Sequence, residues 1–264
     1  MIDTHCHLTY DPLAQQVEEV LERAEQAGVD RMITVGTSPE DAYQAVVLAK
    51  RYEAVSATVG IHPHYADRWT DRAMIVQTMR EMAAGSMIVA LGEMGLDRYY
   101  PDPPFGVQRR AFSWQLEVAA ELDRQGGFTG AIIIHNRQAT ADVVAMIRDC
   151  GIDGGRFVFH CFTGNDDELD AVLELGAMVS FTGIVTFKSA RELAHSATRV
   201  PLDRLMIETD APYLTPEPHR KVRPNEPCFV PYVARFLAGQ RGVDEAVFIT
   251  SVDANAERFF GLSR

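Results

Sequence analysis

Residues 87–93 of this chain read MIVALGE, a run of aliphatic and small residues that ends in the carboxylate of Glu93. A short continuous apolar run of this kind is typical of a strand that is buried on both faces of a parallel sheet. A carboxylate at the end of such a strand is costly to bury without a partner. The stretch therefore predicts a parallel strand that carries one acid to a polar site.

The same pattern recurs along the chain, with amphipathic stretches between the runs. The other runs rich in Ile, Val, Phe or Thr are Met1–His7, Arg31–Gly36, Val55–His62, Ala131–His135, Arg156–His160, Met178–Gly183 and Arg204–Asp210. Eight strands that alternate with helices within 264 residues predict an α/β fold, a TIM-like (β/α)8 barrel that forms a single domain over residues 1–264. A doubly wound open sheet is the structural alternative.

Composition and charge exclude several classes of protein. Hydrophobic residues make up 47% of the chain and charged residues 23%, which is typical of a globular protein and excludes disordered, collagen-like and coiled-coil chains. The net charge of −12 argues against a broad basic face for duplex DNA or an anionic membrane. The four cysteines form no CxxC pair, so we expect reduced thiols.

The location and partners of the chain follow from what the sequence lacks. The first residues, MIDTHCHL, have neither the basic nor the apolar region of a signal peptide. The apolar runs are far shorter than a membrane span. We therefore expect a cytoplasmic protein with no membrane partner, and the sequence does not predict a protein partner.

Six of the eight runs end in an imidazole or a carboxylate, and this favours the barrel over the open sheet. These terminal residues are His7, His62, Glu93, His135, His160 and Asp210. In a (β/α)8 barrel, the carboxyl ends of all the strands meet at the face that carries active sites. His5 joins them because side chains alternate along a strand, so that His5 and His7 share one face. Each of these residues alone also fits a packed or rim position.

Together, the histidines and carboxylates predict a metal centre. Such a concentration of acid and imidazole needs cations to neutralise it. The number of side chains suits two ions, since one ion needs only three or four protein ligands. Glu93 is the natural bridge because a carboxylate has two oxygens to share. Mixed imidazole and carboxylate ligands suit Zn, Mn or Fe, and they suit Mg less well.

Six short motifs, in order along the chain, point to a known family. They are Asp3–Leu8, Gly60–His64, Gly92–Asp97, Ile134–Arg137, His160–Gly164 and Glu208–Leu214. With Asn225–Pro227 and Asn255–Phe260, they resemble the TatD family of metal-dependent hydrolases, within the amidohydrolase-like barrels. The resemblance covers essentially the whole chain. It implies a barrel with two divalent ions (Mg, Mn or Zn) that hydrolyses phosphodiester bonds, as a 3′-to-5′ exonuclease on single-stranded DNA or RNA.

The resemblance also implies a role for each ligand. A first ion is expected to be held by two histidines and an aspartate, namely His5, His7 and Asp210. A second ion is expected to be held by His135 and His160, with Glu93 as the bridge between the two ions. Asp210 and Glu93 are then the expected catalytic residues, and Asp210 takes the proton of the attacking water as general base.

Other residues near these motifs are candidates for contact with substrate. They are His62, His64, Arg137 and Arg223, each of which also fits a rim or loop position without function. Tyr99, Tyr100 and Phe105 either stack on bases or pack their loop onto the barrel. Asp97 is placed to orient a ligand histidine. Cys161 follows a predicted ligand on a strand, so alternation predicts that it points away from the site.

Two other functions stay open at this stage. One is another amidohydrolase-type hydrolase, which acts on a lactone, a cyclic amide or a phosphotriester. Such enzymes often bridge their ions with a carboxylated lysine at the end of the fourth strand, whereas this chain has Glu93 there and no lysine in Met87–Asp97. The other is a metal-free binding module, which is disfavoured because all six expected ligands are present.

Overall fold

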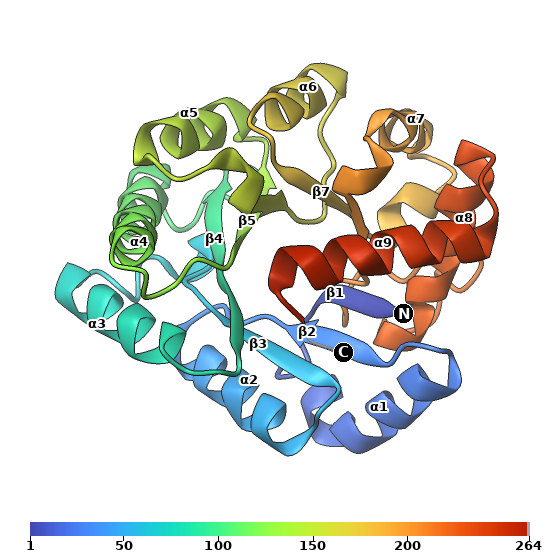
Figure 1. Ribbon diagram of the computed structural model, residues 1–264, viewed down its shortest axis with the longest axis horizontal. Helices are drawn as coiled ribbons and strands as arrows, with labels where there is room; N and C mark the ends of the chain where they lie inside the picture. The colour runs from blue at the N-terminus through green and yellow to red at the C-terminus, as the bar shows by residue number, and fades with distance from the viewer. Residues whose placement is uncertain (263–264) are drawn as a thin grey trace.

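The strands of the sheet lie side by side in the order of the sequence, and all of them are parallel. The computed structural model describes residues 1–262 (Figure 1). The strands are β1 (Ile2–Cys6), β2 (Arg31–Thr34), β3 (Val55–Val59), β4 (Ile88–Asp97), β5 (Ala131–Arg137), β6 (Phe157–Phe159), β7 (Met178–Phe181) and β8 (Leu205–Ile207).

The chain after β8 returns to β1 and closes the ring of strands. Cys6 and Ala211 form a parallel bridge, and the Asp210 N–H donates to the His5 carbonyl at 2.9 Å. The strand order of a doubly wound sheet reverses at a switch point, and this order does not. The predicted TIM-like barrel is therefore confirmed, and the open sheet is excluded.

Most of the helices surround the barrel on its outer side, and the last one crosses one of its ends (Figure 1). The helices are α1 (Val17–Gln26), α2 (Pro39–Arg51), α3 (Arg72–Ala83), α4 (Phe105–Arg124), α5 (Thr140–Cys150), α6 (Asp166–Glu174), α7 (Arg191–Arg199), α8 (Val230–Arg241) and α9 (Glu245–Phe260). Local chemistry starts several of them. The Ser38 hydroxyl accepts from the Asp41 N–H ahead of α2, and Asn165 and Glu168 form a reciprocal capping box at α6. None of the helices in residues 1–262 is both long and apolar enough to cross a bilayer.

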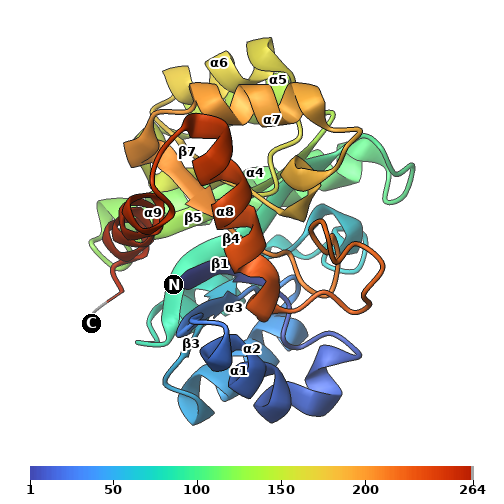
Figure 2. The same cartoon turned by 90° about the vertical axis from the view of Figure 1, so that its right-hand side faces the viewer.

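One end of the barrel is sealed by α9, which leaves the other end for a site. Ala256 and Phe260 of α9 pack against the small cluster of side chains inside the barrel, which includes Ile2, Ile133 and Met206. Figure 2 shows that the loops after β4 (green) and β8 (orange) extend on the side opposite α9. The carboxyl ends of the strands therefore open onto a mouth that is formed by loops.

Several predicted strand ends are wrong by a few residues. β4 continues past Glu93 to Asp97, and its pairing with β5 shifts register between Leu91 and Met94. Gly92 and Gly95 adopt φ values of 113° and 151°, which are open to glycine, and they carry the strand through this bulge. Glu93 thus lies at an irregularity within the strand. In contrast, β6 and β8 stop before His160 and Asp210, which lie on the loops that follow.

The bulge gives a test of the fold. A Cβ at Gly95 would collide with the carbonyl oxygen of His135 on the neighbouring strand, at a φ that side chains disfavour. Gly95→Ala should therefore lower the free energy of unfolding by more than about 3 kcal/mol, measured by urea denaturation. Gly239→Ala in α8 is the matched control, because a Cβ there meets no atom within 4 Å. It should be neutral or stabilise the chain by up to about 1 kcal/mol. Equal effects of the two substitutions would contradict the close β4–β5 approach.

Candidate active site

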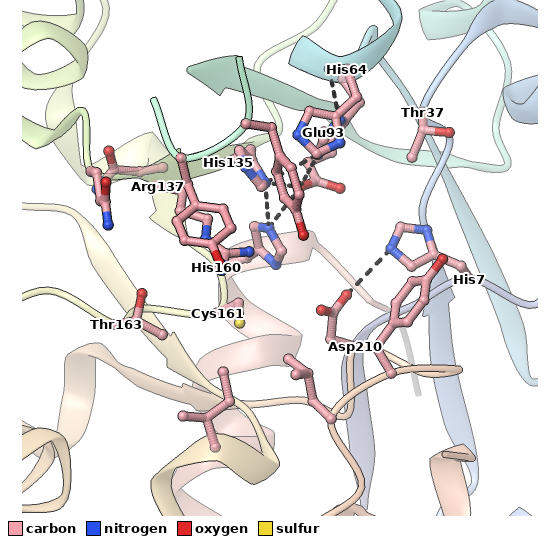
Figure 3. Close-up of a pocket in the computed structure, with 18 of the residues that line it drawn as sticks. His7, Thr37, His64, Glu93, His135, Arg137, His160, Cys161, Thr163 and Asp210 are labelled. Carbon is pink, nitrogen blue, oxygen red and sulfur yellow. Dashed lines mark hydrogen bonds and ion pairs between the residues drawn. The ribbon is translucent and has the colours of Figure 1, made fainter. Parts of the chain in front are cut away.

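A cavity of about 900 Å³ opens at the mouth of the barrel. Most of the expected ligands line it, namely His7, Glu93, His135, His160 and Asp210 (Figure 3). His5 is fully buried at the base of this group, next to Glu93 and Asp210. The predicted convergence of these side chains on one face of the barrel is therefore present in the structure.

The first group of side chains joins β1 to the loop after β8. His7 Nε2 lies 3.3 Å from Asp210 Oδ1, and His5 Nε2 lies 3.8 Å from the same oxygen. One donor atom of each residue lies within 4.8 Å of the others, a spacing that one cation can span. Contact with the two histidines outweighs the effect of burial and lowers the pKa of Asp210, so this carboxylate is ionised. The group can therefore hold a divalent ion.

Glu93 lies between this group and a second one. Its Oε2 is 3.5 Å from His5 Nε2. Its Oε1 is 2.7 Å from His160 Nε2, 2.8 Å from His135 Nδ1 and 3.4 Å from His62 Nε2 (Figure 3). Burial raises the pKa of Glu93, but the surrounding imidazoles outweigh it and hold the pKa well below its usual range. One oxygen of the Glu93 carboxylate thus faces His5, and the other faces His135 and His160. This is the arrangement that a bridging ligand needs.

Two of the histidines have a carboxylate behind them as well as Glu93 in front. His135 Nε2 lies 3.1 Å from Asp97 Oδ2, and His160 Nδ1 lies 3.3 Å from Glu208 Oε1. The other nitrogen of each ring faces Glu93 Oε1. A proton on the nitrogen next to Asp97 or Glu208 would leave the nitrogen that faces Glu93 free to bind a metal ion. Histidine ligands of metals are commonly held in this way by a carboxylate behind them.

Two further observations support a cation at this site. Both ring nitrogens of His5 and the Nδ1 of His7 are buried without a hydrogen-bond partner in the described chain. An unsatisfied buried polar atom costs about 1–3 kcal/mol, and ligation would remove that cost. Burial lowers the pKa of His135 and of His160, yet the adjacent carboxylates outweigh burial and raise both values. A proton and a divalent cation are alternative ways to compensate the same acids. The donor set therefore fits the expected ions.

Comparisons with known proteins agree with this geometry. The sequence model of the family described as "TatD related DNase" matches residues 2–261. The chain belongs to this family. It is 37% identical over 270 residues to the "3'-5' ssDNA/RNA exonuclease TatD" of Pectobacterium parmentieri (strain WPP163), and the match covers 100% of each chain.

Two other relatives extend the comparison across the TatD-related family. The "Uncharacterized metal-dependent hydrolase YabD" of Bacillus subtilis (strain 168) is 35% identical over 263 residues, again with 100% of both chains covered. The crystal structure of YJJV, a TatD homolog from Escherichia coli K12, superposes with a TM-score of 0.90 at 26% identity. That match covers 100% of this chain and 98% of the other. The whole of this TatD-family barrel thus has counterparts in its relatives.

The structure places the four candidates for substrate contact in this TatD-family chain differently. His62 lies within the Glu93 group itself, in a cluster with Glu93 and His135 that could hold an ion. His64 lines the cavity, and its Nε2 is 3.0 Å from Asp97 Oδ2. Arg137 also lines the cavity and is exposed. His62 is therefore better placed as a ligand than the sequence indicated.

Arg223 is the fourth candidate, and the structure does not place it in the cavity. Its Nη1 donates to the hydroxyl of Thr215 and to the carbonyls of Arg220 and Val222. The Nη1 group of Arg223 thus binds its own loop, and the expectation that Arg223 contacts substrate stays a prediction.

The expected orientation of Cys161, away from the site, is wrong. Cys161 lines the cavity with a φ of 44°, because β6 ends at Phe159 and strand alternation no longer applies there. The expected role of Asp97 is present, since its carboxylate contacts His135. Sequence reasoning missed the contact between Glu208 and His160. The signal for it was the position of Glu208 two residues before Asp210, on the same face of the predicted strand.

Proposed function

We propose that the chain is a divalent-metal-dependent hydrolase that digests single-stranded DNA or RNA from the 3′ end. The observation that carries the proposal is Glu93, whose two oxygens face two separate groups of histidines. The names of the TatD relatives support the substrate class. The fourth strand carries Glu93 and no lysine, which disfavours the lysine-bridged hydrolases of lactones, cyclic amides and phosphotriesters.

Each residue of the site has a proposed task. His5, His7 and Asp210 would hold one Mg, Mn or Zn ion, and His135 and His160 would hold another, with Glu93 as a shared ligand. Such ions would supply charge stabilisation of the phosphate and lower the pKa of a bound water. The Asp210 carboxylate is placed to accept a proton from the attacking water. His62 and His64, at the edge of the same cavity, are placed to contact the phosphate or to support the second ion.

A digestion assay tests this function. Protein treated with a chelator is given Mg, Mn or Zn and a single-stranded oligonucleotide that is labelled at its 5′ end. We expect products that shorten progressively from the 3′ end, no cleavage with excess chelator, and slower cleavage of a blunt duplex. The acidic chain favours the single strand because it lacks a broad basic face. Hydrolysis of a lactone, cyclic amide or phosphotriester without cleavage of the oligonucleotide would contradict the proposal.

The carboxylate behind His160 gives a second test. Glu208→Gln removes the charge that holds the His160 proton, so metal affinity should fall roughly 10- to 100-fold. Isothermal titration of chelator-treated protein with Mn measures this change. The matched control is Glu168→Gln, which changes a carboxylate in the same cavity that contacts Thr140 and Asn165 and no histidine. An affinity equal to that of the control would show that Glu208 does not support a ligand.

A further inference from the structure

Three exposed tyrosines line the cavity in the described chain: Tyr99 and Tyr100, directly after β4, and Tyr213, which is 52% exposed in the loop after β8. The side chains of Tyr99 and Tyr100 are 53% and 45% exposed, and both line the cavity. Phe105, in the same loop, is different, because it lies under the Arg98 guanidinium at 3.7 Å and does not line the cavity. Large aromatic side chains are usually buried when they serve only packing. Tyr99 and Tyr100 therefore present aromatic surface to whatever enters the site.

The carboxylate of Asp97 contacts both the backbone of Tyr99 and Tyr100 and two histidines of the site. Asp97 Oδ1 accepts the backbone N–H groups of Tyr99 and Tyr100 at 2.8 and 3.0 Å. Asp97 Oδ2 contacts His135 and His64. The Tyr100 ring also packs edge-on against the His64 ring, with centroids 5.0 Å apart. Asp97, which is buried, thus holds the backbone of both tyrosines next to His64 and His135.

Arg137 supplies a positive charge next to these rings. Its guanidinium lies 4.0 Å from the centroid of the Tyr99 ring and 5.3 Å from that of Tyr100. Arg98 is paired with Asp142, whereas Arg137 forms no ion pair with any residue in the described chain. Figure 3 shows Arg137 at the edge of the cavity that contains His135 and Glu93. In a chain with a net charge of −12, an unpaired exposed arginine beside the site is suited to a phosphate.

We propose that Tyr99, Tyr100 and Arg137 form a nucleotide subsite, in which an unpaired base stacks on the exposed tyrosine surface and Arg137 binds a phosphate of the same strand. This inference rests on the proposed function and assigns residues to its substrate. Stacking uses the π-face that every base has, so the subsite tolerates any sequence. Bases within a duplex are already stacked on each other, so the subsite selects single strands. The same contacts accept DNA and RNA.

Oligonucleotides with one abasic position test the subsite on the unmodified protein. The abasic position is moved one nucleotide at a time from the 3′ end, and KM and kcat are measured for each strand. One position should raise KM roughly 5- to 150-fold, the range expected for the loss of one stacked base. KM that varies by less than about two-fold across all positions would overturn the subsite.

Variants then assign the effect to residues. Tyr99→Ala and Tyr100→Ala should together raise KM on the intact strand by the same factor and leave kcat within about two-fold. They should have little further effect on the strand with the critical abasic position. Tyr99→Phe keeps the ring, so its KM on the intact strand should stay below that of Tyr99→Ala. Tyr43→Ala is the matched control, because Tyr43 is 63% exposed on α2 and does not line the cavity.

The salt dependence of binding tests Arg137 separately. Arg137→Gln should reduce the slope of log affinity against log salt concentration by about one, since one phosphate contact is lost. Arg110→Gln, on the exposed surface of α4, should leave the slope unchanged.

These outcomes separate the subsite from the proposed function. Normal digestion with no effect of the abasic positions or of the tyrosine variants would overturn the subsite and leave the nuclease function intact. If the unmodified protein cleaves no oligonucleotide with any of the three metals, the nuclease function is wrong and the subsite is overturned with it.

Discussion

Replacement of Glu93 by Gln should lower kcat for oligonucleotide cleavage by at least about 10³-fold. Glu93 has a carboxylate oxygen within 3.5 Å of His5 on one side and another within 2.8 Å of His135 and His160 on the other. The amide of Gln has only one oxygen that can act as a ligand, and it carries no charge. We therefore expect the variant to lose at least one equivalent of metal as well as activity.

The measurement combines kcat at saturating Mn with the metal content of the same sample by mass spectrometry. Glu168→Gln again serves as the control, since it changes a carboxylate in the same cavity without contact to a histidine. A Glu93→Gln variant that retains two ions per chain and cleaves at the unmodified rate would remove Glu93 from the catalytic site.

Asp210→Asn should lower kcat by about 10²- to 10⁴-fold even when both metal sites are filled. Asn has the same size, keeps one oxygen toward His7 and tolerates the φ of 54° at this position, so the backbone is expected to stay in place. It lacks the negative charge and cannot accept the proton of the attacking water.

The informative value is kcat at a metal concentration where occupancy has been verified independently. If the fully occupied Asn variant cleaves at nearly the unmodified rate, Asp210 is a ligand only. The base must then be sought elsewhere in the site, for example at Glu208 or His62.

Most of the barrel was predictable because its signals are local. Short apolar runs identified every strand, and six of them ended in histidine or carboxylate. The rule that the carboxyl ends of barrel strands share one face brought His5, His7, Glu93, His135, His160 and Asp210 together. This inference needed no knowledge of which residues contact each other. Sequence reasoning failed where contacts between distant parts of the chain decide where a strand ends or which side chains meet.

The errors have a common physical origin. The continuation of β4 beyond Glu93 depends on pairing with β5 and on two glycines whose φ values cannot be read from composition. The support of His160 by Glu208 joins residues 48 positions apart. A single sequence contains the candidates for such contacts but does not state how they pair.

The most direct test of the central claim is anomalous X-ray diffraction from crystals of the chain grown with Mn or Zn. The account predicts two anomalous peaks at the mouth of the barrel, one against His5, His7 and Asp210 and the other against His135 and His160, with the Glu93 carboxylate between them. One peak alone, or peaks that are ligated by other side chains, would contradict the two-ion site on which the proposed function depends.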